Sequence, residues 1–286
     1  MGKFINPFTD EGFKRIFGRE FSKPILLVFL NALLDGERKI TNIKFLDKEQ
    51  LGLSDGDRSL IYDIYCETED GENIIVEMQN KSQPYFKNRS IYYLSRAIVE
   101  QGERGNTWKY DIKAVYLVAF LNFKQDDIGK EFRTDVSWMD MKYHTPFSDK
   151  GRIIYLQLPY FDKEADECNN IFERFIYVLK HMDVLQRMPW LAQDAVFKRL
   201  SEVAEVAALD KDERQKYDAS LRHYRDTLAV MEGQYLEGED KGRAEGRAEG
   251  REEERQSMAR RMKDDGVPVE TISKYTGLTV DEVNAL

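Results

Sequence analysis

The chain has 286 residues, of which 42% are hydrophobic and 12% aromatic, which is enough apolar material for one sizeable domain or two small ones. The formal net charge of −9 argues against a protein that coats nucleic acid nonspecifically. The same charge is compatible with a nuclease, because the active site of a nuclease can concentrate carboxylates for metal ions. No apolar run reaches the roughly 18 residues that span a bilayer, and the first residues lack a signal-peptide pattern, so we expect a cytoplasmic protein without a membrane partner.

The first predicted elements are two short helices. Apolar residues recur at helical spacing in residues 13–17 and again in residues 25–33, and Gly18 interrupts the pattern between them. The side chain of Thr9 or Asp10 can cap the first helix by accepting a backbone hydrogen bond. A strand is then expected within the segment ITNIKFLD.

The next segment, DIYCETEDGENIIVEMQNK, predicts a β-hairpin. Its turn fits a three-residue loop, residues 69–71, in which the glycine takes the left-handed conformation. With this loop Asp63 lies opposite Glu77, and Gln79 shares their face because it follows Glu77 by two residues. A two-residue Asp-Gly loop would instead place Asp63 opposite Met78 and on a different face from Glu77.

Helix and strand patterns alternate after the hairpin, and only helical patterns follow them. A helix is predicted over residues 86–104, a central strand in the apolar run 111–123, and another strand over 151–161. The helix between the hairpin and the next strand suggests a crossover, so the fold class is α/β. From residue 164 onward the patterns are helical, and an Arg/Glu/Gly repeat of four residues within 241–265 predicts a marginal, mobile helix.

The terminus, GVPVETISKYTGLTVDEVNAL, predicts two short helices around a turn at Gly277. Thr279 and Glu282 have the spacing of a capping box for the last helix. The pair resembles a helix-turn-helix fragment. A tail that docks on a partner explains this pattern at least as well as a DNA-binding motif does. We expect the charged helix and this tail to form a homodimer, because a lone helix of that composition has little apolar stripe to bury.

The polar face of the hairpin can form a metal site. The carboxylates of Asp63 and Glu77 and the main-chain carbonyl of Met78 are the oxygen ligands that Mg²⁺ prefers, together with waters and a substrate phosphate. Asp10 could complete the site if its helix packs beside the hairpin, and Lys14 lies one turn later on the same helix face. The alternatives are solvated charges on a strand face for the hairpin carboxylates, and helix capping for Asp10.

Four segments, in this order, resemble the recombination-promoting nuclease family, the PD-(D/E)XK nuclease family transposases. They are INPFTDEGFKRIFG, the hairpin DIYCETEDGENIIVEMQNK, RSIYYLSRAIVEQGERG with VYLVAFLNF, and the tail GRAEGRAEG with ISKYTGLTVDEV. The resemblance spans nearly the whole chain. It implies a restriction-endonuclease-like α/β fold, a mixed sheet flanked by helices and followed by a helical C-terminal region. It also implies cleavage of DNA phosphodiester bonds with Mg²⁺ or Mn²⁺, associated with recombination or mobile elements.

The resemblance also implies site residues. The acid of the first helix falls on Asp10, with Lys14 beside it, and the strand aspartate falls on Asp63. The Glu-x-Gln pattern falls on Glu77 and Gln79. Asp63 and Glu77 would hold the metal, and the glutamine would orient the attacking water.

Two positions depart from the pattern of the wider superfamily. Tyr62 replaces a proline, and Gln79 stands where a lysine is usual, so a hydrogen-bonding amide replaces a positive charge. Lys14, Lys81 or a second metal ion could supply that charge.

We expect DNA contacts from Lys81 and, on the following helix, from Arg89 and Tyr93. For Arg89 and Tyr93 the simpler role is packing of that helix on the sheet. The alternative to an endonuclease is a catalytically silent interaction or regulatory protein that binds partners through its C-terminal helices. The predicted domains are a nuclease core over 1–165, a helical region that packs on it over 166–235, and a charged helical linker with the small tail over 236–286.

Overall fold

The computed structural model describes residues 2–47, 49–50, 60–103 and 108–286, without the side chain of residue 50. The chain forms two compact units, Met1–Arg225 and Asp226–Leu286. The three-part division expected from the sequence stays a prediction. Within the described residues, each helix is too short or too polar to cross a membrane.

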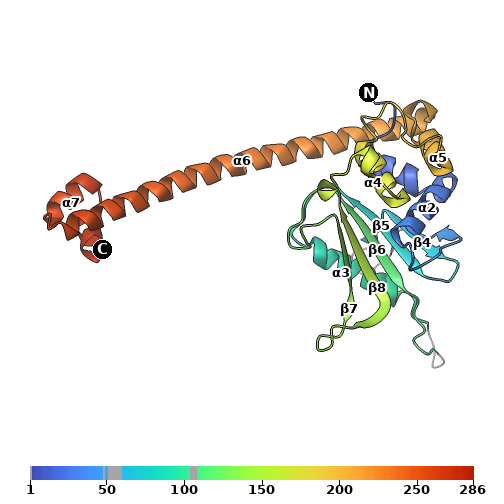
Figure 1. Ribbon diagram of the computed structural model, residues 1–286, viewed down its shortest axis with the longest axis horizontal. Helices are drawn as coiled ribbons and strands as arrows, with labels where there is room; N and C mark the ends of the chain where they lie inside the picture. The colour runs from blue at the N-terminus through green and yellow to red at the C-terminus, as the bar shows by residue number, and fades with distance from the viewer. Residues whose placement is uncertain (1, 48, 51–59, 104–107) are drawn as a thin grey trace. The chain divides into compact units, whose positions relative to one another are not determined.

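A six-stranded mixed sheet organises the first unit (Figure 1). Three central strands are parallel, and the strands on either side of them are antiparallel to their neighbours. The order across the sheet is β1 (Ile43–Phe45), β4 (Ile64–Thr68), β5 (Asn73–Gln79), β6 (Val115–Leu121), β8 (Pro146–Gln157) and β7 (Arg133–Met139). A separate two-stranded sheet pairs β2 (Glu49–Gln50) with β3 (Leu60–Ile61).

The hairpin of β4 and β5 has the predicted register. Gly71 has a φ of 80°, the left-handed conformation that the three-residue loop requires. The ladder pairs Ile64 with Val76, so the next residues outward that oppose each other are Asp63 and Glu77. The two-residue loop is therefore excluded, and Asp63 and Glu77 lie next to each other at the end of the hairpin away from its turn.

Helices cover both faces of the sheet (Figure 1). α3 (Phe86–Val99) is the predicted crossover from β5 to the parallel strand β6, and it packs on one face. The helix ends at Val99, before the predicted residue 104, since residues 100–103 form a turn and irregular structure. The opposite face carries α1 (Asp10–Phe17), α2 (Lys23–Leu33), α4 (Ile171–His181), α5 (Ala195–Ala204) and the start of α6 (Lys211–Asp264). Short 3₁₀ helices are Glu20–Ser22, Leu158–Tyr160, Ala165–Glu167 and Val206–Ala208.

Alternate residues of β5 point to opposite faces of the sheet. Ile74 and Val76 enter the larger core beneath α1 and α2, where Phe120 stacks and tilts against phenylalanines of both helices. Ile75 enters the smaller core beneath α3. Glu77 follows Ile75 by two residues, so its carboxylate occupies a place where a core side chain would contribute about 1.5–3 kcal/mol by burial.

The strand β7 was missed from the sequence, and β8 begins earlier than residue 151. β7 lies at the edge of the sheet and its side chains are mostly exposed, including Val136 and Trp138. Burial on one face produces the alternating apolar pattern of a strand. An exposed edge strand therefore gave little signal.

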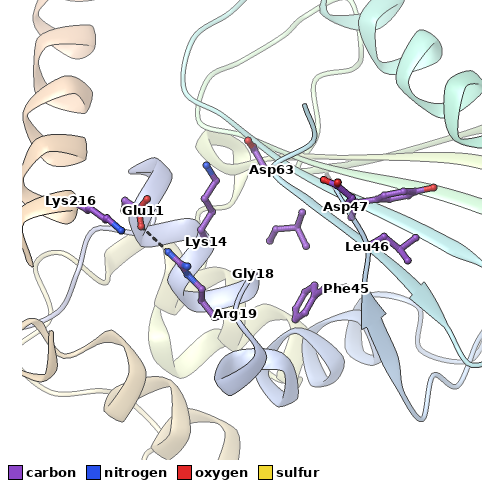
Figure 2. A pocket seen from close by; sticks show the side chains of 11 residues that line it. Glu11, Lys14, Gly18, Arg19, Phe45, Leu46, Asp47, Asp63 and Lys216 are labelled. Carbon is purple, nitrogen blue, oxygen red and sulfur yellow. Dashed lines mark hydrogen bonds and ion pairs between the residues drawn. The ribbon is translucent and has the colours of Figure 1, made fainter. Parts of the chain in front are cut away.

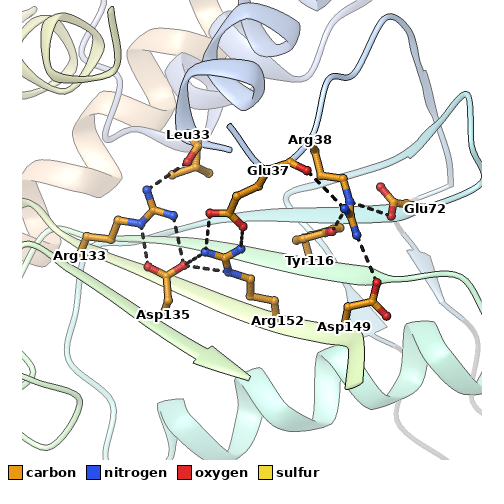
Figure 3. Close-up of polar contacts among 9 residues, drawn as sticks. All are labelled: Leu33, Glu37, Arg38, Glu72, Tyr116, Arg133, Asp135, Asp149 and Arg152. Carbon is orange, nitrogen blue, oxygen red and sulfur yellow. Dashed lines mark hydrogen bonds and ion pairs between the residues drawn. The ribbon is translucent and has the colours of Figure 1, made fainter. Parts of the chain in front are cut away.

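Ion pairs connect this edge of the sheet to the end of α2 (Figure 3). Arg152 on β8 pairs with Glu37 and with Asp135 on β7. Arg133 pairs with Asp135 and donates to the carbonyl oxygen of Leu33 at 3.0 Å. The hydrogen bond from Arg152 holds the pKa of Glu37 below its usual value. Cations and anions satisfy one another here, which indicates a structural role.

The second unit contains the predicted terminal helices. α7 (Val269–Thr276) and α8 (Val280–Ala285) meet at Gly277, whose φ is 69°, and Thr279 and Glu282 form the expected capping box. The helical repeat is part of the continuous helix α6. A small apolar cluster joins the end of α6 to the two terminal helices, through Ala259, Ile272, Leu278 and Val283.

Candidate metal centre

Asp63 and Glu77 are held together by hydrogen bonds between their strands. The amide of Asp63 donates to Oε1 of Glu77 at 3.2 Å, and the amide of Met78 donates to Oδ2 of Asp63 at 2.8 Å. Each carboxylate thus satisfies a backbone amide just beyond the last paired residues of β4 and β5. Glu77 is 4% exposed and Asp63 is half-buried, so Glu77 is not a solvated charge on an open strand face and Asp63 is only partly solvated.

Burial and mutual repulsion disfavour ionisation of this pair. Burial, followed by the charge of Asp63, raises the pKa of Glu77 to about 8. Burial also raises the pKa of Asp63, against the hydrogen bond from the Met78 amide, and the charge of Asp10 adds to the rise. Two adjacent carboxylates of this kind are a site where a cation restores the charge balance.

Gln79 completes the polar face. Its Nε2 atom donates to Oε2 of Glu77 at 3.2 Å, while its main-chain oxygen accepts from the amide of Asn122 at 2.9 Å. The first bond fixes the amide beside the carboxylate, and the second anchors the end of β5 to the end of β6. The structure therefore brings together the three hairpin residues that the sequence singled out.

The carbonyl of Met78 lies on the same edge as Asp63. The amide and carbonyl of one strand residue point toward the same neighbouring strand, and the Met78 amide donates to Asp63. The carbonyl of the next residue, Gln79, faces β6 instead, as its bond to Asn122 shows. Two carboxylates and one carbonyl are hard oxygen donors, a set that fits Mg²⁺ or Mn²⁺ when waters fill the other positions.

The N-terminal segment brings α1 to the end of β5. Nδ2 of Asn80 donates to the carbonyl oxygen of Phe8 at 2.6 Å, two residues before the helix begins. Thr9 is the helix cap, since its Oγ1 accepts from the amide of Gly12 at 3.0 Å. The alternative role proposed for Asp10, capping of this helix, is therefore filled by Thr9.

Asp10 and Lys14 form an ion pair on α1, with 2.5 Å between Lys14 Nζ and Asp10 Oδ1. Their charges act on Asp63 in opposite directions, since Asp10 raises and Lys14 lowers its pKa. Figure 2 shows the Lys14 side chain directed toward Asp63, across a pocket that both residues line. Within the described parts of the chain, no three His, Cys, Asp or Glu side chains form a ready metal cluster, so the role of Asp10 as a ligand stays a prediction.

Arg89 reaches the site from α3. Its charge lowers the pKa of both Asp63 and Glu77. Its guanidinium lies over the rings of Phe86 and Tyr93, at 5.1 and 5.6 Å from their centroids. Stacking therefore holds this cation beside the two carboxylates.

The other residues near α3 have different surroundings. Tyr93 packs edge-on against Tyr62, with ring centroids 5.3 Å apart, and Tyr62 donates to its main-chain oxygen at 3.3 Å. Tyr62 is fully buried, so the residue in the usual proline position is part of the core beneath α3. Lys81 is exposed, and no polar partner is seen for it among the described residues.

Asn6 is a positioning residue that sequence reasoning missed. Its Oδ1 accepts from the amide of Phe8 at 2.8 Å, and its carbonyl accepts from Oγ1 of Thr9 at 2.9 Å. Its amide donates to the hydroxyl of Tyr217 at 2.8 Å. A Cβ at Gly12 would lie 2.1 Å from the Asn6 carbonyl oxygen. The Asn-Pro pair was a signal for a turn, but nothing local indicated a partner more than 200 residues away.

A family model described as PD-(D/E)XK nuclease family transposase matches residues 7–234. No curated protein and no solved structure matches the chain. The matched segment includes α1, the hairpin, α3 and the first part of α6. Together with the mixed sheet and its flanking helices, the match confirms the expected restriction-endonuclease-like α/β fold.

Proposed function

Because the chain belongs to the PD-(D/E)XK nuclease family transposases, we propose that it is a divalent-metal-dependent DNA endonuclease. It would hydrolyse phosphodiester bonds in recombination or in the movement of mobile elements. The observation that carries the proposal is the carboxylate pair Asp63 and Glu77, in which each side chain accepts a hydrogen bond from a backbone amide of the other strand segment and Glu77 is 4% exposed. Burial raises the pKa of both carboxyl groups, so a cation would favour their ionised forms. We place the enzyme in the cytoplasm with DNA as its substrate and no membrane partner.

Asp63, Glu77 and the Met78 carbonyl would hold Mg²⁺ or Mn²⁺. When bound, such an ion lowers the pKa of a coordinated water and neutralises charge that develops on the phosphate. Gln79 would orient the attacking water, since its amide already lies 3.2 Å from Glu77 and is fixed there. Its lack of charge leaves any positive charge near the scissile phosphate to other residues.

The cations around the pair would position the substrate. Lys14 is directed toward Asp63 and could exchange its bond with Asp10 for one to a phosphate oxygen, because the Asp10 side chain is exposed and ion pairs open to solvent contribute only about 0.2–1 kcal/mol. Asp10 would then assist in holding the metal. Arg89, with Tyr93 supporting its stack, and the exposed Lys81 would contact the DNA backbone on the α3 side.

The test is cleavage of supercoiled plasmid. We expect nicking or linearisation by the wild-type protein with Mg²⁺ or Mn²⁺, and none with EDTA. Asp63→Asn and Glu77→Gln should each abolish cleavage. Glu67→Gln is the matched control, because Glu67 lies on the same hairpin and pairs with Asn73 at its far end. Equal activity of all four proteins would assign the cleavage to a contaminant, and inactivity of the wild type would favour the silent interaction protein.

We further propose that residues 226–286 mediate a homodimer, which would place one site near each DNA strand. The side chains of α6 beyond residue 226 are largely exposed, including Val230, Tyr235 and Leu236. Light scattering of the full chain should give the mass of a dimer, and a shortened chain ending at Gln234 should give that of a monomer. Equal monomeric masses would exclude this assembly.

A further inference from the structure

A pocket of about 510 Å³ extends from the candidate metal centre to the first turns of α6 (Figure 2). Asp63 and Lys14 line one part of it, and Arg19 and Lys216 line another. Pockets of about 300–1,000 Å³ hold small-molecule groups such as a nucleotide. The volume beside Asp63 is therefore large enough for a nucleotide unit next to the one whose phosphate would be cleaved.

Tertiary contacts fix Lys216 at this pocket. Tyr217, the next residue, is buried and accepts the hydrogen bond from the Asn6 amide. One turn before it, Glu213 pairs with Arg15 of α1, and one turn after it, Oγ of Ser220 accepts from the amide of Glu11 at 3.2 Å. The start of α6 is thus bound to the helix that carries Lys14.

Lys216 differs from the other cations of the pocket, because it forms no ion pair with the described residues. Lys14 pairs with Asp10, and Arg19 pairs with Glu11 at 3.1 Å. Lys216 is exposed, and in the described part of the chain it has no acidic partner within ion-pair distance. Arg19 and Lys216 also line an adjoining pocket of about 120 Å³. The positive charge therefore continues away from the metal centre along the junction of α1 and α6.

We propose that Lys216, supported by Arg19, is a second phosphate-binding subsite for the DNA backbone. This inference rests on the proposed endonuclease function, and it adds a contact on the α1 and α6 side of the scissile phosphate. Contacts of this kind fix the position of a nucleic acid without reading its sequence. Lys216 is thus a positioning residue, and Asp63 and Glu77 are the groups at the reacting phosphate.

The experiment compares Lys216→Ala with Lys211→Ala, which removes the same charge from the same helix at an exposed position that does not line the pocket. Binding of a short DNA duplex is measured by fluorescence anisotropy in Ca²⁺ at several salt concentrations. One phosphate contact contributes about 0.9 to the slope of log K against log salt. Lys216→Ala should reduce the slope by about that amount and weaken binding roughly 3- to 10-fold at about 0.1 M salt, and Lys216→Arg should restore both.

Lys211→Ala should behave as the wild type, and all three variants should keep the wild-type melting temperature because the changes are on the surface. If the wild type binds and cleaves DNA but Lys216→Ala and Lys211→Ala have equal slopes, the second subsite is wrong and the proposed function stands. If the wild type neither binds nor cleaves DNA, the proposed function fails, and the subsite fails with it.

Discussion

Glu77→Gln should stabilise the metal-free protein at alkaline pH, although it should abolish activity. The substitution keeps the size of the side chain and removes its charge from a position that is 4% exposed. An amide can still accept from the Asp63 amide, and the Gln79 side chain can rotate to present its oxygen to the new NH₂ group. The main change is therefore the loss of a buried negative charge beside Asp63.

The size of the effect follows from the pKa of Glu77, which rises from 4.5 to about 8. One pKa unit corresponds to about 1.4 kcal/mol, so the ionised carboxylate costs at most about 5 kcal/mol in the folded state. The amide keeps part of the burial cost of a polar group, which leaves an expected gain of about 1–3 kcal/mol at pH 9. For a unit of about 225 residues, each kcal/mol raises the melting temperature by about 2–4 °C.

Thermal melts in EDTA, followed by tryptophan fluorescence, are the assay. All three tryptophans, Trp108, Trp138 and Trp190, lie in the first unit, so the signal excludes the unfolding of residues 226–286. Glu67→Gln again serves as the control and should change the melting temperature little. A Glu77→Gln protein that melts below the wild type at pH 9 would refute the reasoning that the carboxylate is held there against its own ionisation.

Two further predictions concern pH and the loop before α1. Between pH 5 and 9 the folded protein binds more protons at Glu77 than the unfolded chain does, so this contribution to stability is complete below about pH 4.5 and is lost as the pH rises through about 8. In EDTA, the melting temperature of the wild type minus that of Glu77→Gln should therefore become more negative as the pH rises over that range. A difference that stays constant with pH would contradict this prediction. Gly12→Ala should destabilise the first unit by about 2 kcal/mol or more, because the added Cβ would lie 2.1 Å from the Asn6 carbonyl oxygen. Gly246→Ala is the control: its position has open space and a helical backbone, so the change should be neutral or stabilise the helix by up to about 1 kcal/mol. Urea titrations followed by circular dichroism measure both effects, and equal effects of the two substitutions would exclude the steric role of Gly12.

Local sequence signals were enough to predict the hairpin and the terminal helices. The glycine of the turn fitted a three-residue loop, which predicts Asp63 opposite Glu77, although the sequence also allowed a two-residue loop that the observed ladder excludes. Thr279 and Glu282 predicted the last helix cap, because a capping box needs only residues three apart. In each case the determining contacts lie within a few residues along the chain.

Other parts of the site depend on contacts that no local pattern encodes. The place of α1 is set by the bond from Asn80 to Phe8 and by Tyr217, a residue of α6 that binds Asn6 across the fold. Lys216 lies at the pocket because similar long-range contacts hold the start of α6 against α1. The residues around it in the sequence predict only a charged helix. The edge strand β7 was missed because its exposed side chains lack the pattern that burial imposes.

The central claim is that Asp63 and Glu77 bind a divalent cation. Its most direct test is to measure the proton release that accompanies Mn²⁺ binding. Isothermal titration calorimetry at pH 7, in buffers of different ionisation enthalpy, counts the protons displaced by the metal. With the pKa of Glu77 raised to about 8, the wild type should bind Mn²⁺ and release about one proton per ion, and Glu77→Gln should show neither. Absence of Mn²⁺ binding by the wild type, or equal binding and proton release by Glu77→Gln, would contradict the account.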